Sequence, residues 1–245
     1  MKRVLLFGVV LALTVGLFTF ISAKGPEYHA GYIRDKVGSK TVMILSKRSG
    51  GSGFFIETEK EDTYILTNRH ICKLSKNGYM DIVVPGSEKV FKQKILKLSD
   101  KYDLCVIESI KGIEGLSLAD DVEISETISI VGHPKLQPLT VSKGELIGYR
   151  YIQIATKNPL PADCKFGVVR ELPPLTAVIF GIKSVCINNY YSGQVTAYSR
   201  GGSSGSPVVN FYGNIVGVLF AGSVKDQFVS FAVPLEDIRE FLNGL

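Results

Sequence analysis

Gly202-Ser203-Ser204-Gly205-Ser206-Pro207 lies near the C-terminal end of this chain. Glycines on both sides of a serine let the backbone turn sharply and direct several N–H groups into one small space. Such N–H groups, here those of Gly202 and Ser204, can stabilise the negative charge that develops on a carbonyl oxygen. A flexible Gly/Ser linker or an ordinary hairpin turn is the alternative. The loop runs straight into Pro207-Val208-Val209 and another strand, which favours a serine loop embedded in a core.

One histidine upstream suits a nucleophilic serine. A hydroxyl attacks a carbonyl at neutral pH only if an imidazole takes its proton and a buried carboxylate orients that imidazole. His70 ends the run Tyr64-Ile65-Leu66-Thr67 and opens a short polar turn, where a ring can face a cleft. His29 lies in a segment without strand character, and His133 lies in a Gly-His-Pro turn. Without serine and aspartate partners, a surface-turn histidine would be the better interpretation of His70.

The candidate carboxylate is Asp103, directly before the apolar run Leu104-Cys105-Val106-Ile107. A carboxylate at the mouth of such a strand is expected to be partly buried, and a buried carboxylate needs a partner. The alternatives are a surface strand cap and the nearby Asp100. The chain order His70, Asp103, Ser204 predicts a catalytic triad with Ser204 as the nucleophile.

A second motif overlaps the loop. Gly201-Gly202-Ser203-Ser204-Gly205 matches the Gly-x-Ser-x-Gly elbow of α/β-hydrolases, with Ser203 as the nucleophile. That fold places its aspartate and histidine after the serine, whereas no histidine follows His133 here. The chain order therefore excludes a lipase or esterase of that fold.

The first 23 residues form a separate segment. Met1-Lys2-Arg3 is followed by an uncharged apolar run from Val4 to Ile21 and a small residue, Ala23, as the cleavage point. This pattern predicts a secretory signal peptide. The run is also close to the length of a membrane span, so an uncleaved N-terminal anchor is the alternative. Either way we expect an exported, periplasmic, secreted or membrane-anchored domain.

Charge and cysteine content exclude some other classes. The formal net charge is +5, and lysines and arginines are interspersed with acids, so nucleic-acid binding is not expected. No Cys-x-x-Cys or zinc-type Cys/His spacing occurs, so we expect no metal and no cofactor. The four cysteines of an exported chain allow three pairings. If the His70 and Asp103 segments meet, Cys72–Cys105 and Cys164–Cys186 are the candidate disulfides; four buried free thiols are an equally weighted alternative.

Short runs of β-branched and aromatic residues recur about every ten residues, which favours a barrel or sandwich over βαβ units. The expected strands are Lys40–Ser46, Gly53–Thr58, Thr63–Thr67, Asp81–Val84, Phe91–Leu98, Leu104–Glu108, Thr127–Val131, Leu139–Ser142, Glu145–Ile154, Val168–Glu171, Ala177–Ile182, Gln194–Tyr198, Pro207–Phe211, Ile215–Phe220 and Phe228–Val233. Only the end is helical by pattern, with Leu235, Ile238, Phe241 and Leu242 on one face after Pro234.

The predicted body is therefore all-β, in two halves divided near residues 109–122, with a terminal helix. His70 and Asp103 fall in the first half and Ser204 in the second. A triad divided in this way implies a cleft between the two halves.

The chain resembles trypsin-like (chymotrypsin-fold) serine proteases, and among them the bacterial Deg/Htr-type branch. The matching segments follow the order of that family along nearly the whole chain after the N-terminal segment: Gly51-Ser52-Gly53-Phe54-Phe55-Ile56, Leu66-Thr67-Asn68-Arg69-His70, Asp103-Leu104-Cys105-Val106-Ile107, Val131-Gly132-His133-Pro134, Gly202-Ser203-Ser204-Gly205-Ser206-Pro207, Gly217-Val218-Leu219-Phe220-Ala221-Gly222 and Phe231-Ala232-Val233-Pro234.

The resemblance implies a protease domain over residues 24–245 after the signal or anchor of residues 1–23. It implies two perpendicular six-stranded Greek-key β-barrels, at about residues 30–115 and 122–233, and a helix at 235–243. His70 would be the general base, Asp103 its orienting partner and Ser204 the nucleophile. The oxyanion hole would be formed by the N–H groups of Gly202 and Ser204. Protein or peptide substrates are expected.

Three features depart from the family. Ser203 stands where trypsin has the aspartate that pairs with a new N-terminus, so activation by propeptide cleavage is not expected. No PDZ domain follows Leu245 in this sequence. Residues 155–186 exceed the usual length between these strands and contain Pro159, Pro161, Pro173 and Pro174, which indicates a loop or extra hairpin beside the cleft.

By resemblance, the primary specificity pocket would be walled by Phe220, Ala221 and Gly222, with residues around Tyr198 at its base. No acidic residue occupies those positions, so we expect small or medium apolar side chains before the cleaved bond. The alternative functions are a catalytically silent relative that binds peptides or partner proteins in the same cleft, and an exported β-domain with a structural role only.

Overall fold

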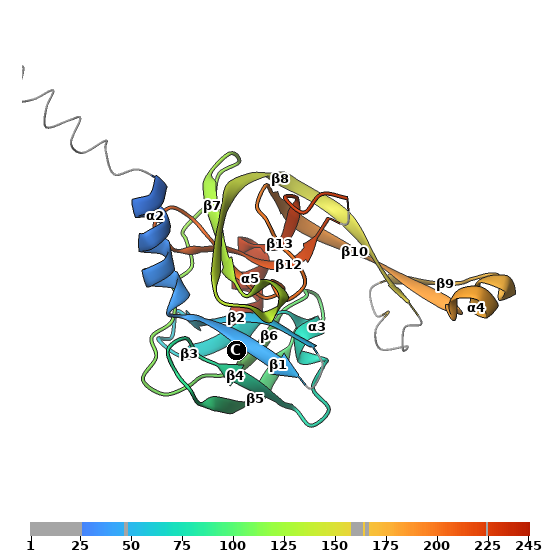
Figure 1. Ribbon diagram of the computed structural model, residues 1–245, viewed down its shortest axis with the longest axis horizontal. Coiled ribbons are helices and arrows are strands. Elements are labelled where there is room, and N and C mark those ends of the chain that lie inside the picture. The colour runs from blue at the N-terminus through green and yellow to red at the C-terminus, as the bar shows by residue number, and fades with distance from the viewer. Residues whose placement is uncertain (1–25, 47–48, 158–163, 165–166, 224) are drawn as a thin grey trace, which may run out of the picture.

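The computed structural model describes residues 26–245 except 47–48, 158–163, 165–166 and 224. Two β-barrels lie against each other, with strands β1–β6 in one and the later strands in the other (Figure 1). The predicted fold class, an all-β chymotrypsin-like protein with a C-terminal helix, is confirmed. The triad segments predicted for the two halves accordingly lie in different barrels.

The first barrel is closed in the order β1-β2-β3-β6-β5-β4. Its interior is filled by aliphatic and aromatic side chains with no exposed area, among them Val42, Ile44, Phe55, Ile65 and Ile107. Alternate residues of each strand point inward, so these side chains line a single interior. The strands are β1 (Thr41–Ser46), β2 (Ser49–Glu57), β3 (Thr63–Thr67), β4 (Tyr79–Val83), β5 (Val90–Leu98) and β6 (Cys105–Glu108).

The second barrel belongs to a seven-stranded sheet in the order β13-β12-β11-β7-β8-β10-β9. An added pairing between β13 and β10 closes six of the strands into a ring and leaves β9 outside it. The strands are β7 (Thr127–Gly132), β8 (Thr140–Lys157), β9 (Gly167–Glu171), β10 (Ser184–Val195), β11 (Pro207–Val209), β12 (Ile215–Gly222) and β13 (Ser230–Pro234).

One apolar cluster spans the interface between the barrels. It joins Phe54 and Leu104 of the first barrel to Val131 and Val218 of the second, all with no exposed area. Ile238 of the C-terminal helix α5 (Leu235–Asn243) completes it. Burial of this shared surface fixes the relative position of the barrels, and with it any site divided between them.

Short helices surround the barrels. At the N-terminal side lie α2 (Pro26–Ile33) and the π-helix η1 (Arg34–Gly38); α3 (Arg69–Cys72) and the 3₁₀ turn η2 (Pro134–Leu136) lie closer to the interface. The sequence predicted none of these four. They are too short, or too weakly patterned, to show the apolar periodicity of a helix.

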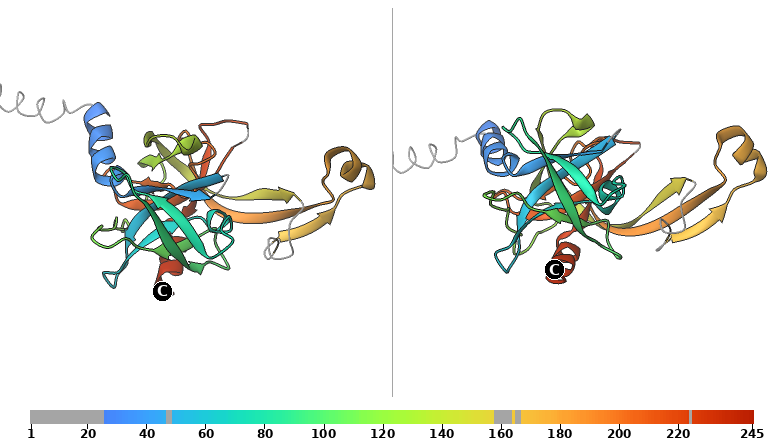
Figure 2. Two further views of the ribbon diagram at one scale, coloured as in Figure 1. Left: turned by 60° about the horizontal axis from the view of Figure 1, so that its bottom comes forward. Right: turned by 90° about the horizontal axis from the view of Figure 1, so that it is seen from below.

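β8 and β10 extend beyond the barrel as a two-stranded arm, which carries β9 and helix α4 (Pro174–Phe180) at its far end (Figure 2). The extra hairpin expected within residues 155–186 is thus part of a projecting arm. The strand expected at Ala177–Ile182 is wrong, because most of it lies in α4. The apolar run has no alternation that separates strand from helix, and Pro174 is well suited to the first position of a helix. Of the strand expected at Gln194–Tyr198, only Gln194 and Val195 are in a strand, at the end of the much longer β10, and residues 196–198 lie outside it.

Two disulfides join the cysteine pairs considered from the sequence. Cys72 and Cys105 link α3 to β6, with sulfurs 2.02 Å apart. Within the arm, Cys164, which lies between β8 and β9, is linked to Cys186 of β10, with sulfurs 2.03 Å apart. The first connects segments immediately next to His70 and Asp103. It therefore restrains the part of the first barrel that bears the two residues.

Candidate active site

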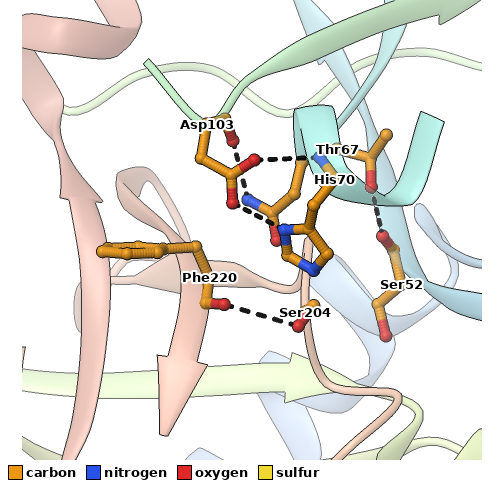
Figure 3. A network of polar contacts seen from close by, with 7 residues as sticks. Ser52, Thr67, His70, Asp103, Ser204 and Phe220 are labelled. Carbon is orange, nitrogen blue, oxygen red and sulfur yellow. Dashed lines mark hydrogen bonds and ion pairs between the residues drawn. The ribbon is translucent and has the colours of Figure 1, made fainter. Parts of the chain in front are cut away.

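The end of β3 determines where His70 lies. Asn68 leaves the strand with extended backbone angles, and α3 then turns the imidazole toward Asp103. His70 Nδ1 lies 2.6 Å from Asp103 Oδ2, and the His70 backbone N–H donates to Oδ1 at 2.9 Å (Figure 3). Both carboxylate oxygens are thus engaged by one residue. This arrangement orients the ring and leaves Nε2 as the free nitrogen.

The two side chains of the pair differ sharply in solvent exposure. The Asp103 side chain is 9 % exposed, whereas that of His70 is 46 % exposed. Asn68 Nδ2 also donates to the Asp103 carbonyl oxygen at 3.0 Å, which fixes the backbone that bears the carboxylate. A buried carboxylate thus faces an imidazole whose other edge is open to the cleft.

Burial lowers the pKa of His70, but the charge of Asp103 and its hydrogen bond raise that pKa more, so the net shift is upward from 6.5. In the neutral ring the proton resides on Nδ1, because the carboxylate accepts it there. Nε2 is then unprotonated and suited to act as a general base.

Ser204 faces the cleft, and its neighbour Ser203 does not. Ser203 is 4 % exposed, and its Oγ accepts from the backbone N–H of Arg200 at 3.3 Å. Ser204 Oγ donates to the Phe220 carbonyl at 3.5 Å, and among the described residues it has no hydrogen bond to His70 (Figure 3). Catalytic hydrogen bonds are often long before substrate binds.

Ser52 of β2 holds the serine loop in place. Its N–H donates to the Ser204 carbonyl at 2.7 Å, and its Oγ donates to the Gly202 carbonyl at 2.9 Å. The same Oγ accepts from the His133 N–H at 2.9 Å. Thr67 Oγ1 in turn donates to the Ser52 carbonyl at 2.7 Å. One residue of the first barrel therefore fixes two carbonyl groups of the loop on the second.

The loop itself requires glycine. Gly202 and Gly205 have φ values of +93° and +85°. A Cβ on Gly205 would lie 2.0 Å from the Ser52 carbonyl oxygen, and one on Gly202 would lie 2.6 Å from that of His133. Within the described chain, the N–H groups of Gly202 and Ser204 donate to no protein acceptor. They are the pair expected to form an oxyanion hole.

A cleft of about 1040 Å³ contains His70, Asp103 and Ser204 in its lining. Of the residues predicted for the specificity pocket, Phe220, Ala221 and Gly222 line this cleft and Tyr198 does not. The Tyr198 ring instead lies 6.0 Å from that of Phe228, which does line the cleft. The sequence did not indicate the other residues that line the cleft. They lie before the serine, on the arm and after β12: Ile154, Tyr190, Ser199, Arg200, Gly201, Ser223, Lys225, Asp226 and Gln227. No sequence pattern marks a loop that lines a cleft only after folding.

The other two histidines have structural contacts. His133 is 6 % exposed and bonds through Nδ1 with the Gln137 carbonyl at 3.0 Å; burial lowers its pKa. His29 stacks on Phe211 with ring centroids 4.1 Å apart. In the described part of the chain, no group of three or more His, Cys, Asp or Glu side chains is arranged to hold a metal ion.

The family described as trypsin-like peptidase domain matches residues 51–218. This chain belongs to that family. It is 24 % identical over 218 residues to the serine protease Do-like HtrA of Lactococcus lactis subsp. lactis, covering 84 % of this chain and 47 % of that protein. It is 26 % identical over 219 residues to a probable periplasmic serine endoprotease DegP-like of Rhizobium meliloti, covering 86 % and 36 %. These relatives place the chain in the Deg/Htr branch, and it spans less than half of their length.

Solved structures share the fold. The active form of the Rv3671c protease from M. tuberculosis matches with a TM-score of 0.64 and 15 % identity, over 89 % of this chain and 86 % of that one. The serine endoprotease from Yersinia pestis matches with a TM-score of 0.62 and 16 % identity, over 88 % and 65 %. At these identities the likeness shows the architecture alone.

Replacing Ser52 by alanine tests the loop anchor. Ser52→Ala removes the hydroxyl between the Gly202 carbonyl and the His133 N–H, so the oxyanion loop loses a restraint without losing a reacting group. We expect the rate of labelling by a fluorophosphonate to fall by about tenfold to a hundredfold, since two hydrogen bonds of about 1 kcal/mol each are lost. Ser46→Ala, in the same barrel, serves as the control. A labelling rate equal to the parent's would show that Ser52 does not position the loop.

The raised pKa of His70 sets the expected pH dependence. The base must be neutral, so kcat/KM should rise with pH through a transition above 6.5. Asp103→Asn removes the two effects that raise the pKa and leaves burial, so the transition should move to lower pH. The plateau should also fall by about 10⁴-fold, because the amide no longer holds the reactive tautomer.

Asp100→Asn is the control, since Asp100 is the nearest other aspartate. The measurement is the pH profile of kcat/KM for all three proteins on one peptide. A profile of Asp103→Asn that matches the parent in midpoint and height would contradict the role of Asp103.

Proposed function

We propose that this chain is a serine endopeptidase that hydrolyses protein or peptide substrates through a His70-Asp103-Ser204 triad. The observation that supports this most strongly is the 2.6 Å contact between His70 Nδ1 and Asp103 Oδ2, made beside Ser204 in one cleft. A partly exposed imidazole that is hydrogen-bonded to a buried carboxylate can act as a general base. Membership of the trypsin-like peptidase family supports the same activity.

The proposed reaction has two halves. Ser204 Oγ attacks the scissile carbonyl carbon while His70 Nε2 takes its proton, and the N–H groups of Gly202 and Ser204 stabilise the oxyanion. Asp103 stabilises the imidazolium that forms. His70 then protonates the leaving amine, and an acyl group remains on Ser204. A water molecule, deprotonated by His70, attacks that ester and releases the second product.

Export is part of the proposal. Residues 1–23 have the pattern of a signal peptide or anchor, although that segment lies outside the described residues. Disulfides persist in oxidising compartments, and all four cysteines are paired in the structure. A relative is described as periplasmic. We infer that the domain acts outside the cytoplasm, whether released or tethered. No helix in the described part of the chain is long and apolar enough to cross a membrane.

One observation favours a second candidate, a protease-like domain that binds peptides without cleaving them. Ser204 Oγ is bonded to the Phe220 carbonyl rather than to His70. If that rotamer persists with substrate bound, the hydroxyl is not activated and the cleft only binds. The two candidates share the same cleft and differ only in the reactivity of one hydroxyl.

Fluorophosphonate labelling separates the candidates. We expect the full-length parent and Ser203→Ala to be labelled, because Ser203 Oγ is buried, and Ser204→Ala to be unlabelled. Intact-protein mass spectrometry reads the adduct, and circular dichroism confirms that each variant is folded. A folded parent that resists labelling would rule out an autonomously active protease and favour the silent binder.

We also propose small or medium apolar side chains on the residue before the cleaved bond. Phe220 and Ala221 line the cleft beside Ser204, which supports this preference. Asp226 also lines the cleft, but so do the cationic residues Arg200 and Lys225, and Asp226 Oδ1 accepts the N–H of Phe228 at 2.9 Å. A peptide library should therefore be cleaved after Val, Ala or Leu at least about tenfold faster than after Arg. Efficient cleavage after Arg would overturn this assignment.

A further inference from the structure

A second cavity, of about 290 Å³, adjoins the catalytic cleft. Asp103, Tyr190 and Phe220 line both spaces, so a chain seated in the cleft passes beside this cavity. Its remaining walls come from the segment before β6, the base of the β8–β10 arm, Val233 of β13, and α5. None of the triad chemistry described above uses it.

Aromatic rings dominate the walls of this cavity. Tyr190 and Phe220 have ring centroids 5.5 Å apart, and Tyr151 and Tyr191 have centroids 5.2 Å apart. Tyr102 lines it as well. Tyr151 is 73 % exposed and Tyr191 is 46 % exposed. Large rings left exposed around a hollow mark a binding surface more often than a stabilising core.

The cavity also contains the carboxylate of Asp237, a residue of α5. Asp237 is half-buried, and burial raises its pKa more than a hydrogen bond with Tyr102 and the nearby charge of Lys101 lower it. Lys101 is the cation in the lining, but its ammonium lies 2.8 Å from both Glu240 oxygens. No salt bridge among the described residues engages Asp237. A bound cation would offset the desolvation of this carboxylate.

We propose that this cavity binds the side chain of a lysine or arginine of the substrate, at a position away from the scissile bond. The assignment rests on the proposed endopeptidase activity. The faces of Tyr and Phe rings attract ammonium and guanidinium groups, and Asp237 supplies the opposite charge. The same cluster already makes such a contact, since Lys101 Nζ lies 4.9 Å from the centroid of Tyr102. The volume is that of one long side chain rather than of a folded segment.

The test scans one basic residue along a peptide. Internally quenched peptides with a fixed apolar residue before the cleaved bond place Lys, Arg or Gln at each other position in turn. For the full-length parent we expect kcat/KM at one position to be about tenfold higher with Lys or Arg than with Gln, the size of a cation–π contact plus an ion pair. Equal values for Lys, Arg and Gln at every position would overturn the assignment.

Two variants and two controls locate the effect. Asp237→Asn removes the charge and Tyr151→Leu removes a ring face, so each should bring the basic-to-Gln ratio several-fold closer to one. Glu236→Gln makes the same charge change on the neighbouring residue of α5, and Tyr79→Leu removes an exposed ring of the first barrel. Neither control residue lines the cavity, so the ratio should remain at the parent value. A ratio that falls equally in Glu236→Gln would show a general charge effect and contradict the pocket.

Binding to Ser204→Ala separates this inference from the proposed activity. The probe is a fluorescein-labelled copy of the best Lys peptide. If nothing is cleaved, an apolar peptide with one Lys replaces it. The binding of each Lys peptide is compared with that of its Gln counterpart by fluorescence anisotropy. Tighter binding of the Lys peptide that is lost in Ser204→Ala/Asp237→Asn supports the pocket even if the parent proves inactive. Cleavage and labelling with no such difference would leave the protease assignment intact and refute the pocket.

Discussion

Ser52 of the first barrel holds the serine loop of the second barrel in position by hydrogen bonds, so that the two barrels form one site. Its N–H and Oγ bind the carbonyls of Ser204 and Gly202, while its own carbonyl accepts from Thr67, three residues before His70. The histidine and aspartate belong to one barrel and the serine to the other, so their alignment depends on contacts across the interface. Apolar burial brings the barrels together, but burial is non-directional. These few hydrogen bonds are directional, and they hold the serine loop in one orientation against the strand that leads to the histidine.

The second constraint is the burial of the Asp103 carboxylate. Its two oxygens accept from the ring and the backbone of the same histidine, so burial is compensated by bonds that also select the ring tautomer. The Cys72–Cys105 disulfide ties the adjoining segments together. The arrangement differs from a surface ion pair, which solvent would screen. Asp103 lines both the cleft and the aromatic cavity, together with Tyr190 and Phe220.

Much of this site was accessible from the sequence, because its residues lie in local patterns. His70 and Asp103 are each adjacent to an apolar strand, and Gly202 and Gly205 flank the serines because the loop needs left-handed backbone angles. Other features arise only on folding. Tyr198 was expected at the base of the specificity pocket, and the loop after β12 was not foreseen, since neither position is encoded by periodicity. Helix α4 was mistaken for a strand because a short apolar run contains no signal that distinguishes the two. The aromatic cavity joins residues separated by more than 130 positions, from Tyr102 to Asp237.

In the proposed reaction, Ser204, His70 and the two loop amides converge on one reacting carbonyl. The most direct measurement is a crystal structure of the full-length chain treated with an alkyl fluorophosphonate. We expect phosphorus bonded to Ser204 Oγ, the phosphonyl oxygen about 2.7–3.1 Å from the nitrogens of both Gly202 and Ser204, and His70 Nε2 within hydrogen-bond distance of the adduct. An adduct on another residue, or a phosphonyl oxygen directed to solvent with the Gly202 N–H turned away, would contradict the proposed reaction.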